Sequence, residues 1–226
     1  MTPPGFRTGG PVGAIIGSVA KAQSNEGVRR RELRRDAVDN RDRVLAAATA
    51  AVRREGAGVP MATIAADAGV GVGTVYRHFP SREALLEALT RRSFRFVLDA
   101  AEKAARTERP GIDAVRRFLE QTIEHGPDLV LPLHGGPLPL DAETVGIQAE
   151  VHRKLGALLG KGRQDGTIRT NVRAADLVLF GALLAQGLPN VPDWQQAARR
   201  LADIYVAGLR PTGSDADPDA DSDRQF

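Results

Sequence analysis

The sequence predicts an all-α fold of about nine helices along its 226 residues. Apolar residues recur with the period of a helix through most of the chain, and no segment shows the sustained alternation of a strand bounded by turns. Glycine and proline clusters interrupt the pattern at intervals that suit helices of ordinary length. We expect four parts: a disordered basic extension (1–38), a three-helix domain (39–92), a larger helical domain (93–210) and a disordered acidic tail (211–226).

Composition and charge narrow the possible functions. The chain has no cysteine, which excludes disulfides, thiolate nucleophiles and cysteine metal sites. Residues 28–95 carry fourteen arginines and eight acidic residues, a balance of +6, whereas residues 96–226 have a balance of −4. This asymmetry is typical of a polyanion-binding module joined to a domain that does not touch the polyanion.

No apolar stretch approaches the ~18 residues needed to span a bilayer, so no membrane partner is expected. The run Val12–Ala20 has the outline of a signal peptide, but it is short and broken by Gly13 and Gly17. We interpret it as part of a disordered leader or as the result of an upstream start codon, and we expect a cytoplasmic, nucleoid-associated protein.

The N-terminal domain is predicted to begin with a helix over Asn40–Glu55, followed by short helices at about 62–68 and 72–78. A pair of glycines ends the first helix. Its apolar stripe consists of Val44, Leu45, Ala48, Ala51 and Val52.

A long helix is predicted next. Pro80 ends the preceding short helix because proline disfavours helical geometry at the residue before it, Phe79. Ser81 is a suitable N-cap for the new helix, and Glu83 lies in its first turn, where a negative charge is favourable. We expect the helix to extend to about Arg106.

The rest of the chain predicts four further helices, at about 112–125, 143–163, 173–187 and 193–209, with a Pro/Gly-rich stretch over Gly126–Leu140. Asp193 and Gln196 have the spacing of a capping box at the start of the last helix. The wide apolar face of this helix comprises Trp194, Ala197, Ala198, Leu201, Ile204, Tyr205 and Leu209.

The segment Met61–Phe79 predicts a helix-turn-helix, since two short helices are joined by a brief turn that contains glycine. Gly69 suits the left-handed backbone that reverses the chain. Ala65 is small enough to lie where the two helices cross. The expected core of the unit consists of Ile64, Val70 and Val75.

The second short helix would enter the major groove of DNA with its N-terminus. Val72 and Thr74 are suited to contact thymine methyl groups or base edges. Phosphate contacts are expected from residues at the rim of this surface: Thr63, Tyr76, Arg77, His78 and Arg82. Gly71 and Gly73 carry no side chain and would permit close approach of the backbone. Tyr76 as a packing residue and His78 as an ordinary surface histidine are the alternatives for those two positions.

The run from Val44 to Leu89, with IAADAGVGVGTVYRHFPSREALL at its centre, resembles the DNA-binding domain of the TetR family of bacterial regulators. The match covers about 50 residues, and the order Ala-Gly-Val, Gly-Thr-x-Tyr-x-His-Phe, Pro-Ser-Arg-Glu-Ala-Leu-Leu is highly specific. The family often has Ser-Lys where this chain has Gly71-Val72, so base-specific contacts are expected to be fewer or redistributed. The arginine-rich stretch 28–43 either reaches the minor groove as an arm or is a solvated extension.

The resemblance implies a helical ligand-binding and dimerisation domain after the helix-turn-helix domain. It implies a homodimer formed by the last two helices, although the small residues Gly181, Ala182 and Ala185 could instead belong to the internal core. It also implies an unidentified small-molecule effector. Aromatic and histidine side chains suggest an effector pocket: Phe96, Phe118, His125, Phe180 and Trp194.

No catalytic, metal or cofactor site is predicted, because the histidines lack metal-ligand spacing and no phosphate-loop or dinucleotide motif is complete. An enzyme is therefore not expected. The favoured function is a transcriptional regulator, most simply a repressor that binds a pseudo-palindromic operator and is released by an effector. The alternative is a helical small-molecule-binding or architectural DNA-binding protein without sequence-specific regulation.

Overall fold

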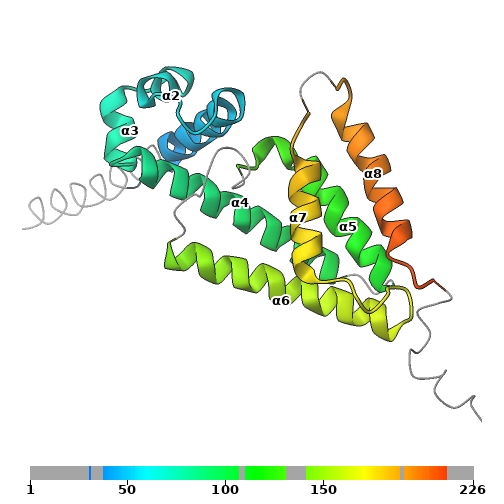
Figure 1. Ribbon diagram of the computed structural model, residues 1–226. Helices are drawn as coiled ribbons and strands as arrows, with labels where there is room; N and C mark the ends of the chain where they lie inside the picture. Colours follow the sequence, from blue (N-terminus) through cyan, green and yellow to red (C-terminus); the bar gives the residue numbers. More distant parts are fainter. Residues whose placement is uncertain (1–30, 32–37, 107–109, 131–140, 189–190, 213–226) are drawn as a thin grey trace, which may run out of the picture.

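The structure, a computed structural model, describes residues 31, 38–106, 110–130, 141–188 and 191–212. Over these residues the chain is helical with no strand, which confirms the predicted all-α class (Figure 1). The described residues form eight α-helices and one short 3-10 helix, which comes close to the predicted nine. In chain order they are the first helix over residues 38–55, α2 (Met61–Asp67), α3 (Val72–His78), α4 (Arg82–Ala105), α5 (Gly111–Glu124), η1 (Gly126–Asp128), α6 (Ala142–Gln164), α7 (Ala174–Ala185) and α8 (Trp194–Gly208).

Two apolar cores lie at opposite ends of α4. Figure 1 shows α4 leading from the unit of the first helix, α2 and α3 to the bundle of α5, α6, α7 and α8. Its first turns contribute Leu85 and Leu89 to the smaller core, and its later turns contribute Val97 and Ala101 to the larger one. The two cores therefore share the helix α4.

The N-terminal unit follows its sequence pattern closely. All five residues of the predicted stripe on the first helix are buried in the smaller core. The Ser81 hydroxyl oxygen accepts the Ala84 N–H at 3.2 Å and caps α4 as expected. The pKa of Glu83 lies below its ordinary value because its carboxylate is hydrogen-bonded by its own backbone N–H and by Ser81. Phe79 has an extended backbone before Pro80, so α3 ends where the proline predicted.

The start of the last helix differs from the prediction. Asp193 has a left-handed backbone (φ +54°) and its side chain makes no capping hydrogen bond, so the expected capping box with Gln196 is absent. Instead, the indole Nε1 of Trp194 donates a hydrogen bond to the Leu184 carbonyl at 2.9 Å and ties the start of α8 to the end of α7. A hydrogen bond between two helices is therefore found here in place of the capping box that the spacing of Asp193 and Gln196 suggested.

The apolar face predicted for the last helix is only partly used in the core. Ala198 and Leu209 are buried, whereas Leu201 and Ile204 are exposed. The buried positions include Ala202 and Val206, which the sequence pattern did not single out. The helix therefore presents two apolar sides, one toward α5 and one toward solvent.

Glycine 111 marks a close approach of two helices that the sequence did not reveal. A Cβ atom on Gly111, the first residue of α5, would lie 2.2 Å from the backbone nitrogen of Gly162 in α6. The Gly111 N–H donates to the Asp165 carboxylate at 2.7 Å, which keeps the backbone of α5 pressed against the end of α6. Pro110-Gly111 is therefore a packing contact as well as a break between helices.

We expect Gly111→Ala to lower the free energy of unfolding by roughly 2 kcal/mol, because the added methyl group overpacks against backbone that cannot rotate away. Gly156→Ala in α6 is the matched control: its Cβ would meet open space, so the change is expected to stabilise the helix by up to about 1 kcal/mol. Urea denaturation followed by circular dichroism measures both. Equal effects of the two substitutions would contradict the close approach.

The expected disorder of the extension (1–38) and of the tail (211–226) falls mainly outside the described residues, as does most of the arginine-rich stretch. The Gly126–Leu140 stretch is described only to residue 130, and its start forms η1. Among the described helices none is long and apolar enough to cross a membrane.

Candidate nucleic-acid interface and ligand cavity

The turn between α2 and α3 has the geometry of a helix-turn-helix. Gly69 is in the left-handed region (φ +64°), as predicted. Its N–H donates to the Ala66 carbonyl at 3.1 Å, and the Val70 N–H donates to the Ala65 carbonyl at 3.0 Å. This pair of bonds forms a Schellman motif, which ends α2 and reverses the chain. A side chain with a Cβ would be strained at Gly69 because of its positive φ.

The inner side of the two helices is packed as the sequence predicted. Val75 is wholly buried, and Ile64 and Ala65 are each 1% exposed. They join the core made by the first helix and the start of α4, against which Val70 also packs. The orientation of α3 is therefore fixed from beneath by apolar contacts, which leaves its other side free.

The outer side of α3 carries the residues predicted to meet DNA. Val72 is 41% exposed and Tyr76 is 47% exposed. The exposure of Tyr76 does not support its interpretation as a packing residue. Arg77 is exposed as well, while Thr63, Thr74 and His78 are half-buried. Gly71 and Gly73 are exposed, and no atom lies within 4 Å of where a Cβ would be.

Arg82 has a role that sequence reasoning missed. Its Nη1 donates to the carbonyls of Val59 at 2.8 Å and Ala57 at 3.2 Å. The side chain thus links the loop before α2 to the start of α4. The sequence contained a signal for this role. The backbone carbonyls of a loop between two helices have no helical partners and need hydrogen-bond donors from side chains.

A largely apolar cavity of about 240 Å³ lies within the larger helical domain. Its lining comes from four helices, and the polar side chains in it are Thr122, Gln148 and His152. The apolar lining consists of Phe94, Val97, Phe118, Ala175, Val178, Leu179, Gly181 and Ala182.

The structure does not bring the five predicted pocket residues together. Phe118 lines the cavity, but Phe96 stacks on His125 at 5.6 Å between ring centroids and faces a different cleft. Phe180 stacks on Tyr205 of α8 at 3.9 Å, and Trp194 binds the end of α7. Aromatic type alone did not identify the lining, because these rings pack between pairs of helices. The residues that were missed, Gln148 and His152, lie one turn apart on α6, a spacing visible in the sequence.

The small residues of α7 point inward. Gly181 faces α5, where a Cβ would lie 3.4 Å from Cγ2 of Thr122, and Ala185 packs against Gly126. The large exposed apolar residues of α7 are Leu179 and Leu183. Gly181 and Ala185 therefore belong to the internal core, and a dimer contact through α7 stays a prediction.

The two units are joined by specific polar contacts. Arg53 of the first helix donates through Nη1 to the carbonyls of Gly126 at 2.8 Å and Leu129 at 3.1 Å. The Val130 N–H donates to the Ser93 hydroxyl at 2.8 Å, and Val130 itself packs into the core of the N-terminal unit. The segment after α5 is thus attached to the helix-turn-helix unit. Burial lowers the pKa of Arg53, partly offset by Asp128.

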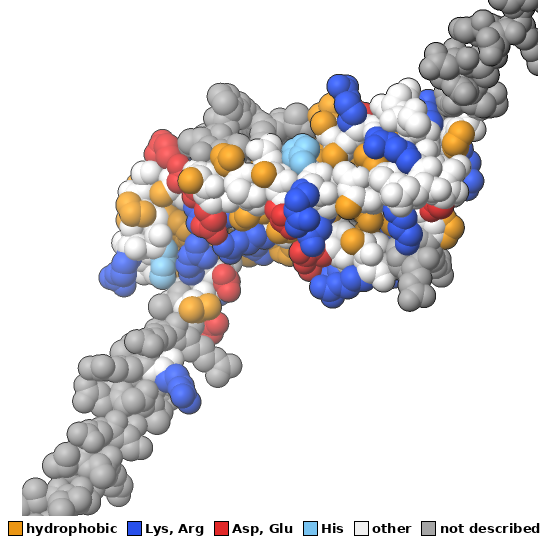
Figure 2. Space-filling view, turned by 90° about the horizontal axis from the view of Figure 1, so that it is seen from below, with side chains coloured by type: hydrophobic (Ala, Val, Ile, Leu, Met, Phe, Trp, Pro, Cys, Tyr) orange, Lys and Arg blue, Asp and Glu red, His pale blue; other side chains and the backbone are white. Residues whose placement is uncertain are grey.

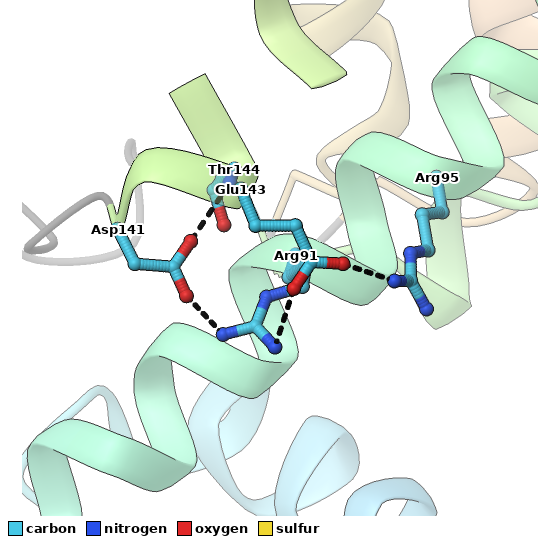
Figure 3. A network of polar contacts seen from close by, with 5 residues as sticks. All are labelled: Arg91, Arg95, Asp141, Glu143 and Thr144. Carbon is cyan, nitrogen blue, oxygen red and sulfur yellow. Dashed lines mark hydrogen bonds and ion pairs between the residues drawn. The ribbon is translucent and has the colours of Figure 1, made fainter. Parts of the chain in front are cut away.

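An ion-pair network joins α4 to the start of α6 (Figure 3). Arg91 lies between Asp141 and Glu143, with its Nη1 3.2 Å from Oε2 of Glu143, and Arg95 pairs with the other oxygen of Glu143. Asp141 also accepts the Thr144 N–H at 2.7 Å. The contacts with Thr144, followed by the Arg91 guanidinium, hold the pKa of Asp141 below its ordinary value. Figure 2 shows basic and acidic side chains interspersed over the middle of the face seen from below.

Nothing in the described part of the chain forms a cluster of three or more His, Asp or Glu side chains that could hold a metal ion. The features that the fold presents are the exposed side of α3 and the partly open cavity. These are features of a binding protein, and both match what the resemblance led us to expect.

Comparisons with known proteins agree along the chain. Residues 44–89 match the family of bacterial regulatory proteins described as the tetR family, and residues 110–211 match the C-terminal domain of SbtR-like transcriptional regulators. The HTH-type transcriptional repressor LfrR of Mycolicibacterium smegmatis is 38% identical over 80 residues, which are 35% of this chain. The chain spans 42% of the length of that curated relative.

Solved structures extend the similarity over both units. The TetR transcriptional regulator SCO0520 from Streptomyces coelicolor is 30% identical with a TM-score of 0.54, over 76% of this chain and 99% of that one. The TetR transcription regulatory protein from Mycobacterium vanbaalenii is 30% identical with a TM-score of 0.53, over 79% of this chain and 99% of that one. With the helix-turn-helix geometry, these matches show that the chain belongs to the TetR family of bacterial transcriptional regulators.

Proposed function

We propose that the chain is a repressor that binds a pseudo-palindromic operator as a homodimer and releases it when a small molecule enters the cavity. The observation that carries this proposal is the two-sided character of α3. Its inner residue Val75 is wholly buried, while Val72 and Tyr76 project into solvent from a helix that the core holds in place. A surface of this kind matches the major groove, which admits one α-helix.

Each residue on the outer side of α3 has a proposed role. Val72 and Thr74 contact bases, since a methyl group suits the thymine methyl and a hydroxyl suits base edges or phosphates. Gly71 and Gly73 let the backbone come close to the duplex. Phosphates are held at the rim by Thr63, Tyr76, Arg77 and His78, with Arg82 contributing through the donors that its two carbonyl contacts leave free.

The proposed dimer forms through the exposed sides of α7 and α8. Leu183 on α7 is 50% exposed and Ile204 on α8 is 69% exposed, and the large apolar side chains Leu179 and Leu201 on the same two helices are exposed as well. The stacking of Phe180 on Tyr205 joins these two sides. A two-fold dimer through them would present two α3 helices to the two halves of a palindrome.

The route proposed from the cavity to DNA follows the contacts of α4 and α5. Phe94 and Val97 line the cavity from α4, which begins in the helix-turn-helix unit. Thr122 lines it from α5, whose end leads into η1 and the two carbonyls held by Arg53. A ligand that shifts α4 or α5 therefore acts on both attachments of the N-terminal unit. Differential binding of ~1–3 kcal/mol is enough for such coupling.

The second candidate function, a DNA-binding protein without sequence discrimination, is favoured by one observation. Gly71 and Gly73 occupy two positions at the leading end of α3 and offer no side chain to a base. A salt titration of binding to a candidate operator and to a scrambled duplex separates the two functions. Both predict a fall in affinity of ~10³–10⁵ between 50 and 200 mM salt for ~6–10 phosphate contacts. A preference of ~10³ or more for one sequence is expected only of the regulator.

The roles within α3 are tested by two substitutions. We expect Tyr76→Ala to weaken binding to all sequences by about tenfold, because it removes a phosphate contact from an exposed position. Thr74→Ala is expected to relax discrimination at particular base pairs and to leave binding to scrambled DNA nearly unchanged. Fluorescence anisotropy with a panel of single-base operator variants measures both. Equal losses on every sequence from the two substitutions would contradict these assignments.

A further inference from the structure

The polar side chains of the cavity offer mainly hydrogen-bond acceptors. His152 is placed by a hydrogen bond between its Nδ1 and the Gln148 carbonyl at 2.9 Å. A carbonyl can only accept, so Nδ1 carries a proton. When the imidazole is uncharged, its Nε2 has a lone pair and can accept a hydrogen bond from a ligand.

The Thr122 hydroxyl is also limited to accepting a hydrogen bond. It is 4% exposed, and its hydroxyl donates to the Phe118 carbonyl at 2.9 Å within α5. Because its one proton is used there, its oxygen can only accept from a molecule in the cavity. The Gln148 side-chain amide lines the cavity and offers both a donor and an acceptor.

The other residues that line the cavity disfavour a charged ligand. Within the part of the chain that the structure describes, no Asp, Glu, Lys or Arg side chain lines this cavity. An ion would lose its hydration there without gaining a counter-charge, which is costly. The volume of about 240 Å³ lies below the ~300–1,000 Å³ of typical ligand pockets, so the occupant is small.

From these observations we infer that the cavity takes a small, uncharged and mainly apolar molecule that donates a hydrogen bond, in the chemical class of phenols and alcohols. The hydroxyl of the ligand donates to Nε2 of His152, and its oxygen accepts from the Gln148 amide. The apolar body lies against Phe118, Val178 and their neighbours. The inference rests on the proposed function, since it names the effector class for the same cavity.

The test uses three probes of similar size, titrated into the full chain by calorimetry without DNA: 4-ethylphenol, its methyl ether 4-ethylanisole, and 4-ethylbenzoate. We expect the phenol to bind most tightly and the ether about tenfold more weakly, because the ether leaves a buried acceptor without a partner. The benzoate is expected to bind more weakly than the ether. No measurable binding of the phenol at millimolar concentration, equal binding of phenol and ether, or tightest binding of the benzoate would overturn the inference.

Two variants locate the binding. His152→Leu is expected to abolish the preference for phenol over ether while leaving the affinity for the ether within about threefold, a selectivity that a merely structural residue would not produce. Gly181→Ala places a methyl group 3.4 Å from Thr122 Cγ2, where it fits the empty cavity but takes space from a ligand. This substitution is expected to weaken the binding of the phenol and of the ether by the same factor. Gly160→Ala, whose Cβ meets open space on α6, is the control and is expected to change neither. An unchanged preference in His152→Leu would overturn the inference.

A separate titration keeps this inference distinct from the proposed function. DNA affinity is measured by anisotropy with and without saturating 4-ethylphenol. If the phenol binds with the expected preference but leaves DNA affinity unchanged, the proposed release mechanism is wrong and the assignment of the ligand class stands. If a ligand outside this class binds in the cavity and releases DNA while the phenol does not bind, the assignment is wrong and the proposed function stands.

Discussion

Gly73→Glu is expected to reduce DNA affinity by at least ~10²-fold on every sequence. Gly73 lies on the exposed side of α3, one residue after its start, and a Cβ there meets no atom within 4 Å. A carboxylate at this position would face the phosphates across the narrowest part of the proposed interface. Juxtaposed like charges cost several kcal/mol, and each 1.4 kcal/mol is about tenfold in affinity. A dimer carries the substitution twice.

The fold should tolerate this change. A glutamate in the first turn of a helix is favourable, and α3 is held in place by Val75 and its neighbours on the opposite side. Gly156→Glu on α6 is the matched control, because it introduces the same side chain at a helical glycine with open space around it. Anisotropy measures DNA affinity and thermal melting checks the fold. Loss of affinity in both variants, or in neither, would contradict the placement of α3 against DNA.

Ile204→Glu is expected to convert the proposed dimer into folded monomers. Ile204 is 69% exposed in the single chain, so the substitution leaves the internal core intact. In the proposed dimer both copies of the side chain are buried, and each contributes ~1.5–3 kcal/mol. The dissociation constant of the dimer should rise by ~10²–10⁴ before the added cost of burying the carboxylates. Operator affinity should fall with it, because a monomer contacts only half of a palindrome.

Sedimentation equilibrium measures the dimer, and circular dichroism measures the helical content. Val145→Glu on α6 is the control, since Val145 is a comparably exposed apolar residue (49%) outside α7 and α8. It should remain dimeric and bind DNA like the unsubstituted protein. A dimeric Ile204→Glu variant, or a monomeric Val145→Glu variant, would mean that the subunits meet elsewhere.

Much of the N-terminal unit could be predicted from the sequence because its signals are local. The positive φ of Gly69 follows from the turn that a helix-turn-helix requires, and the end of α3 follows from the restriction that Pro80 places on Phe79. The cap at Ser81 depends on residues within one turn. In such cases the residue and its partner are neighbours in the chain, so the pattern itself contains the interaction.

The cavity could not be predicted in the same way. Its lining combines residues from α4, α5, α6 and α7, and the aromatic residues selected by type, such as Phe96 and Phe180, stack on partners far along the chain. The capping box expected at Asp193 was wrong for a related reason. A tertiary hydrogen bond from Trp194 to Leu184 sets the start of α8, and the left-handed backbone at Asp193 carries no capping bond.

By itself, the sequence determined the all-helical class, the helix-turn-helix unit and which side of α3 is polar or small, because helical period, glycine and proline act over a few residues. Only the tertiary structure decided which apolar residues remain exposed on α7 and α8, where Gly111 meets Gly162, and that Gln148, His152 and Thr122 share one cavity. The physical reason is that burial and close approach depend on the packing of helices that are distant in the chain. A helix with two apolar sides does not reveal, from its own residues, which side its neighbours will cover.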